Sequence, residues 1–155
     1  MADLIIKPAS GSDSLIFQDG AGTAVATIST NNILYGKGVR ENATTATVTN
    51  GSVVVDLAAG NFFTADLVGS NANITTFTFS NPAASGTASA WTIKFIQDTS
   101  NTAAKVFTYP SSILWSGGID HVMSTANDAV DIVSFFTIDG GTTVYASLVG
   151  SAFAA

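Results

Sequence analysis

The 155-residue sequence contains no cysteine, which excludes disulfides, thiolate metal sites and thiol nucleophiles together. It is also poor in charge, because only 10% of its residues are charged, whereas a typical globular domain carries about a quarter. Hydrophobic residues make up 46%. A surface with so few ions need not all face bulk water, and this favours contact with other copies of the chain or with another protein.

Basic residues are the scarcest charged class. Five Lys and Arg against eleven Asp and Glu give a net charge of -6 and a pI near 4.2. Proteins that bind a phosphate backbone need clustered Lys and Arg, so we expect no nucleic-acid partner. No apolar run approaches the roughly 20 residues of a membrane span, and the N-terminus lacks the pattern of a signal peptide. We therefore expect synthesis in the cytoplasm and no membrane insertion.

Helical periodicity is scarce, and short runs of β-forming residues separated by Gly, Asn, Asp, Ser and Pro dominate the sequence. This pattern predicts an all-β fold in three parts. Residues 1–28 form a small hairpin or anchor, 29–51 a linker or arm, and 52–155 an antiparallel, jelly-roll-like β-sandwich. Seven strands are expected in the last part, at 53–57, 62–68, 74–79, 90–97, 105–109, 132–138 and 144–149.

Two of these strands have informative faces. In 90–97, alternation places Trp91, Ile93 and Phe95 together on one face, as expected for a strand with one wet side. In 131–138 both faces carry apolar residues, which predicts two surfaces to pack against. Asp139 and Gly140 then give a strong hairpin signal between this strand and 144–149.

Catalytic and metal chemistry find little support. His121 is the only histidine, and its spacing from Asp120, Asp128 and Asp131 matches no metal loop, so we interpret it as a structural or surface residue. The Gly-x-Ser-x-Gly turn of serine hydrolases is absent. We expect no cofactor, no metal and no enzymatic activity.

Two acids embedded in apolar strands, Asp56 and Asp66, leave a glycosidase-like alternative open, although turn capping explains them more simply. The run at 36–41 lacks a complete phosphate-loop motif and is better explained as a charged, flexible segment. Its residues Lys37, Arg40 and Glu41 are candidates for docking to a partner.

Aromatic side chains could serve as stacking platforms for sugars. Trp91 lies in a regular alternating strand and is expected in the core. Trp115 precedes Ser116 and two glycines, so it could be exposed in a loop, and it is the candidate glycan contact. Packing under that loop is the alternative.

Residues 72–153 contain several short sequence motifs in a characteristic order and spacing, at 80–87, 91–98, 109–110, 115–118 and 135–145. In these motifs, the second half of the chain resembles the C-terminal β-domain of many virion proteins of tailed bacteriophages. The segments 6–11 and 15–19 resemble a short repeat common in phage fibres.

The resemblance implies a homotrimer on the virion surface, without catalytic residues, in contact with other virion proteins. The chain has no room for a fibre shaft, which favours a capsid decoration or short head-fibre protein. A short tail fibre or tail-tip subunit that recognises host-surface glycan is the alternative, and a carbohydrate-processing enzyme ranks third. Val133, Phe135 and Phe153 are the candidate residues of the trimer interface.

Overall fold

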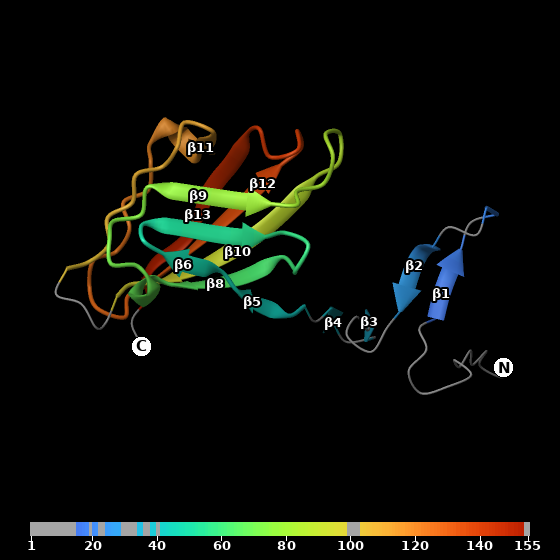
Figure 1. The fold of residues 1–155 in the computed structure, drawn as a ribbon, viewed down its shortest axis with the longest axis horizontal. Coiled ribbons are helices and arrows are strands. Elements are labelled where there is room, and N and C mark those ends of the chain that lie inside the picture. The colour runs from blue at the N-terminus through green and yellow to red at the C-terminus, as the bar shows by residue number, and fades with distance from the viewer. Residues whose placement is uncertain are drawn as a thin grey trace. The chain divides into compact units, whose positions relative to one another are not determined.

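The computed structural model describes residues 15–18, 20–21, 24–28, 34–35, 38–39, 41–98 and 103–153. The chain divides into two compact units, Met1–Glu41 and Asn42–Ala155. Within the described ranges both units consist of strands, and the only helical segments are two 3-10 turns, Leu67–Gly69 (η1) and Ser116–Gly118 (η2) (Figure 1). The prediction of an all-β fold is confirmed. No helix in this part of the chain is long and apolar enough to cross a membrane.

The N-terminal unit contains two short antiparallel pairs. Strands β1 (Leu15–Gln18) and β2 (Ala24–Ile28) form the hairpin that the sequence predicts. Strands β3 (Leu34–Tyr35) and β4 (Gly38–Val39) form a second pair, inside the stretch expected to be a linker. The apolar run at 4–6, predicted to belong to the hairpin unit, lies outside the described residues.

The C-terminal unit contains two sheets. A six-stranded sheet has the order β11-β13-β12-β10-β8-β5, and a three-stranded sheet has the order β6-β7-β9. The strands are β5 (Ala43–Thr45), β6 (Thr47–Thr49), β7 (Ser52–Asp56), β8 (Phe62–Asp66), β9 (Thr76–Ser80), β10 (Ser89–Ile96), β11 (Ile113–Trp115), β12 (Val130–Thr137) and β13 (Val144–Phe153).

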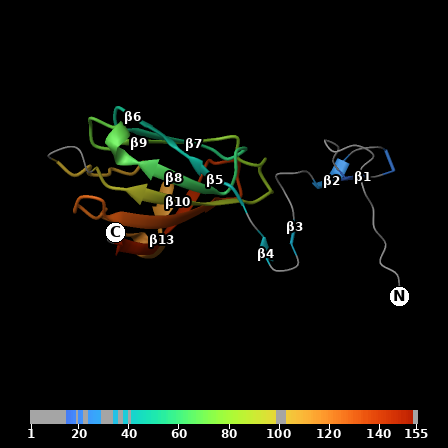
Figure 2. The same ribbon diagram turned by 90° about the horizontal axis from the view of Figure 1, so that it is seen from below.

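The two sheets pack face to face around one apolar core. Figure 2 shows β6, β7 and β9 in one layer and β10 and β13 in the other. As predicted, Trp91, Ile93 and Phe95 of β10 point to the same side and are buried. Phe79 of β9 joins the layers, because its ring centroid lies 4.8 Å from that of Trp91 and 5.5 Å from that of Phe135.

The expected antiparallel jelly-roll is wrong. Strand β8 pairs in parallel with both β5 and β10, β7 pairs in parallel with β9, and β11 in parallel with β13. The path of the connections between the strands explains this parallel pairing. From β7 to β10 the chain crosses from one sheet to the other after each strand, so each strand runs in the direction of the one two places earlier. This winding resembles a β-solenoid more than a jelly-roll.

The β-rich unit also begins before the expected boundary at residue 52. Residues 43–49 supply β5 and β6, one strand to each sheet, so they are not a linker. Asn50 and Gly51, with φ of 45° and 81°, form the tight turn between β6 and β7. Asn-Gly between β-forming residues is a hairpin signal, and the sequence interpretation missed it.

The hairpin expected around Asp139 is confirmed, since β12 and β13 pair antiparallel on either side of it. The Asp139 carboxylate accepts hydrogen bonds from the Thr137 hydroxyl at 2.8 Å and from the Thr143 backbone N–H at 2.9 Å. Gly140 and Gly141 complete the turn with φ of 71° and 84°. These positive angles explain why the turn requires glycine.

Residues 105–109, predicted as a strand, pair with the rest of the fold only through an isolated bridge between Phe107 and Ile74 among the described residues. Buried Gln97, just after β10, holds the start of this segment. Its amide nitrogen donates to the backbone oxygens of Lys105 and Ser124, and its oxygen accepts from the Lys105 backbone N–H at 2.8 Å. The Lys105 ammonium also lies 3.3 Å from the buried Asp98 carboxylate.

Candidate functional site

The main polar centre of the C-terminal unit is the carboxylate of Asp131 on β12, whose side chain is 1% exposed. Its oxygens accept hydrogen bonds from the Ser124 backbone N–H and hydroxyl, both at 2.7 Å, and from the Ala152 backbone N–H at 2.9 Å. His121 Nε2 lies 3.0 Å away. One carboxylate therefore joins three segments: the loop after β11, the start of β12 and the end of β13.

The electrostatics of Asp131 follow from these contacts. Burial raises the pKa of its carboxyl group, but hydrogen bonds from Ser124, Ala152 and His121 more than offset burial, so the pKa lies below its ordinary value. A buried carboxylate that accepts hydrogen bonds from several segments holds those segments together. The interpretation of His121 as a structural residue agrees with this arrangement.

The acids near His121 do not converge. Asp120 and Asp128 are exposed, and no group of three metal-ligating side chains exists in the described part of the chain. Asp56 accepts hydrogen bonds from the Asn81 amide and the Ala58 backbone N–H, and these lower the pKa of its carboxyl. Asp66 caps η1 by accepting from the Val68 backbone N–H. The general acid of a glycosidase needs a raised pKa, so the lowered pKa of Asp56 does not suit that role.

Trp115 is not an exposed sugar platform, because its side chain is only 8% exposed. The expectation that Trp115 is exposed in a loop, where a glycan could stack on its ring, is therefore wrong. Its ring packs edge-on against Tyr109 at 4.8 Å and lies 5.9 Å from the ring of His121. Burial, together with the nearby negative charges of Asp120 and Asp131, raises the pKa of Tyr109 well above its usual range. The alternative, packing under the loop, is the observed one.

The predicted interface residues on β12 lie on the inner face of the sheet. Val133 and Phe135 are 0% and 2% exposed and belong to the chain's own core. The alternation of residues in the sequence correctly indicated two apolar faces on this strand. The prediction that Val133 and Phe135 lie on the outward face was wrong. The outward face instead carries Phe136, which is 45% exposed.

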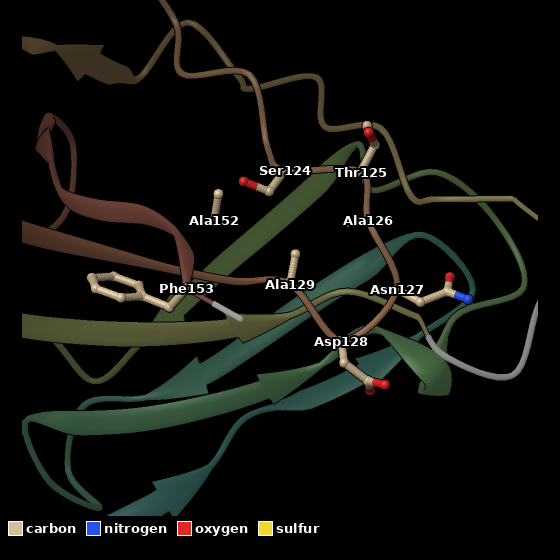
Figure 3. Close-up of a pocket in the computed structure, with 8 residues that line it drawn as sticks. All are labelled: Ser124, Thr125, Ala126, Asn127, Asp128, Ala129, Ala152 and Phe153. Carbon is tan, nitrogen blue, oxygen red and sulfur yellow. The ribbon is translucent and has the colours of Figure 1, made fainter. Parts of the chain in front are cut away.

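The remaining predicted residues fall in different places. Phe153, at the end of β13, is 49% exposed. It borders a cavity of about 440 Å³ beside the loop 124–129. Figure 3 shows the Ser124 side chain directed toward Ala152 there, and Asn127 directed away from Phe153. Of the docking candidates, Glu41 is exposed, whereas Lys37 and Arg40 lie outside the described residues.

The sequence interpretation missed the apolar residues on the outward face of the six-stranded sheet. Phe136 and Tyr145 face each other across β12 and β13 and stack with centroids 4.9 Å apart. Leu114 continues this row on β11, and Phe62 lies opposite Thr92. The cross-strand pairings place two charged residues, Lys94 and Asp66, on this outward face.

A shallow cavity of about 500 Å³ lies beside the stacked pair and is lined by Leu114, Trp115, Ser116, Phe136, Tyr145, Ala146 and Ser147. Its polar groups are mainly hydroxyls, and none of its side chains is charged. The signal for this row was present in the sequence, because the hairpin around Asp139 sets Phe136 opposite Tyr145 once its register is known.

The chain was compared with protein families, curated proteins and solved structures, and no family model, no curated protein and no solved structure matches it.

Proposed function

We propose that the chain is a non-enzymatic structural protein of a tailed-bacteriophage virion, a capsid decoration or short head-fibre protein. It is made in the host cytoplasm and assembles as a homotrimer on the particle surface, in contact with other virion proteins. The resemblance of residues 72–153 to phage virion domains motivates this proposal. The acids that could have argued for an enzyme, Asp56 and Asp66, serve in turns and caps.

One structural observation carries the assembly part of the proposal, namely the weakly charged outward face of the six-stranded sheet. Phe62, Leu114, Phe136 and Tyr145 are 40% to 47% exposed on this face. Large exposed apolar areas on folded proteins typically mark interaction sites. A subunit contact through this face would bury the stacked rings of Phe136 and Tyr145 and account for part of the chain's low charge.

The virion role is tested by rebinding. Capsids stripped of the protein are mixed with the purified full chain and separated by density, and we expect the protein to return to the capsid fraction at a fixed stoichiometry. The variant Phe136→Lys should bind much less, while Val106→Lys, the same charge change at an exposed apolar residue outside the six-stranded sheet, serves as the control. Recovery with tail complexes only, and none with capsids, would contradict a location on the head.

A second function, recognition of a host-surface glycan, is favoured by the cavity beside Tyr145. An exposed aromatic ring next to serine hydroxyls suits a sugar, because the apolar face of a sugar stacks on the ring while its hydroxyl groups form hydrogen bonds. On a glycan array, Tyr145→Ala should abolish any specific signal and Phe62→Ala should retain it. An array without signal for the wild-type chain would count against this alternative.

A further inference from the structure

Strand β13 is paired along one side only for most of its length. It runs from Val144 to Phe153 and pairs antiparallel with β12, with a register shift on either side of Ile132. On its other side the pairing with β11 covers only 144–146, because the chain turns away from the sheet at η2. Within the described residues, positions 147–153 therefore form an open sheet edge. Such an edge presents backbone donors and acceptors that another strand can pair with.

A groove lined by both apolar and polar side chains runs beside this open edge. A cavity of about 430 Å³ lies between β13 and the loop after η2, and Ile119, Val122 and Leu148 are among its lining residues. Ile119 and Val122 are 79% and 81% exposed, and Val149, further along β13, is 61% exposed. An open edge with apolar side chains on both sides has the chemistry of a site for an added strand, where the backbone pairs and apolar side chains fill the groove.

The charge of the groove restricts its occupant. Asp120 is exposed in its lining, and the other ionisable lining residue, His121, is engaged by Asp131. An apolar extended segment that carries a basic residue would therefore complement the groove. The parts of this chain outside the described residues contain one run of three large apolar residues, Leu4-Ile5-Ile6, and Lys7 follows it directly.

We propose that residues 4–7 of a neighbouring copy add to the open edge of β13 as an extra strand, with the apolar side chains against Ile119, Val122 and Leu148 and Lys7 near Asp120. This inference rests on the homotrimeric assembly proposed above. If each copy supplies its segment to the next, the contact is heterologous, and in the proposed homotrimer three such contacts close into a ring with cyclic symmetry. Each copy would then cover the exposed edge of another.

Because the chain has no native cysteine, any disulfide must form between the introduced cysteines. Chains carrying Ile5→Cys and chains carrying Val149→Cys are co-expressed with different tags, isolated by both tags and oxidised under mild conditions. Because a disulfide forms only when two Cα atoms lie about 4.4–6.8 Å apart, we expect a reducible dimer that contains both chains. Leu4→Cys and Ile6→Cys are tested alongside, since neighbouring side chains on a strand point in opposite directions. Val106→Cys, at an exposed residue outside the six-stranded sheet, replaces Val149→Cys as the matched control and should give little dimer.

Two results would overturn the inference. One is cross-linking at 149 that is no stronger than cross-linking at 106 for all three N-terminal positions. The other is a disulfide formed only within single chains of an Ile5→Cys/Val149→Cys double variant, because it would place the segment on its own copy. Light scattering on the same samples separates the proposals, since a trimer without cross-links removes only the strand addition, whereas a monomer contradicts the assembly as well.

Discussion

Replacing Asp131 with Asn tests the polar centre of the C-terminal unit. The change conserves shape but removes the charge and turns one acceptor oxygen into a donor. One carboxylate oxygen accepts from the Ser124 backbone N–H, and the other accepts from the Ala152 backbone N–H. Whichever oxygen the amide nitrogen replaces, one of these backbone groups loses its acceptor. The Ser124 hydroxyl can rotate to compensate, but a backbone N–H cannot.

The magnitude follows from these contacts. An unsatisfied buried donor costs about 1–3 kcal/mol, and the remaining bonds weaken because charge-assisted bonds are roughly twice as strong as neutral ones. We expect Asp131→Asn to lower the free energy of unfolding by about 2–4 kcal/mol. At about 2–4 °C per kcal/mol for a chain of this size, the melting temperature should fall by about 5–15 °C.

The assay is urea unfolding followed by fluorescence and circular dichroism at pH 7 and at a series of lower pH values. The pKa of Asp131 is lower in the folded chain than its ordinary value. Its stabilisation is therefore fully present above about pH 4, near the unfolded pKa of Asp, and is lost as the pH falls through the folded value. The difference between wild type and Asp131→Asn should shrink accordingly in acid.

The matched control is Asp128→Asn, on the same loop, because Asp128 is exposed and its φ of 58° suits Asn equally well. Its free energy of unfolding should change by less than about 0.5 kcal/mol. The reasoning is refuted if Asp131→Asn unfolds within that margin of the wild type at pH 7, or if the difference persists unchanged in acid.

Three further changes test the fold. Phe135→Ala should cost about 3–5 kcal/mol in urea unfolding, because the side chain is 2% exposed. Phe136→Ala should cost much less when the chain is dilute enough to be monomeric, and equal losses under that condition would contradict the assignment of the two faces. Gly51→Ala should lower the melting temperature, because φ is 81° and the new Cβ would lie 2.7 Å from the Asn73 oxygen; an unchanged melting temperature would count against this turn. Gln97→Leu should cost about 2–4 kcal/mol by leaving buried backbone groups unpaired, and a neutral result in urea unfolding would show that these contacts contribute little.

Local patterns in the sequence predicted local structure well. Alternation in 90–97 identified the buried face of β10, and Asp139 with Gly140 located the β12–β13 hairpin, because both signals depend only on neighbouring residues. The Asn50-Gly51 turn carried an equally clear signal that was misinterpreted as the end of a linker. That error moved the expected start of the β-rich unit past β5 and β6.

Features set by distant parts of the chain could not be predicted. Alternation showed that β12 has two apolar faces, but only the packing of Phe79 against Phe135 identifies the inner one. Parallel pairing depends on where the connections carry the chain, and the sequence does not specify this. Asp131 likewise could not be distinguished from other acids, because its donors come from residues 121, 124 and 152.

The most direct test of the central proposal, that copies of this chain associate through the outward face of the six-stranded sheet, is the mass of the full chain in solution. Sedimentation equilibrium should give three times the 15.8 kDa chain mass for the wild type. The single-chain mass is expected for Phe136→Lys, with an unchanged circular dichroism spectrum. A wild-type chain that stays monomeric over a wide concentration range, or a Phe136→Lys variant that remains trimeric, would contradict the account.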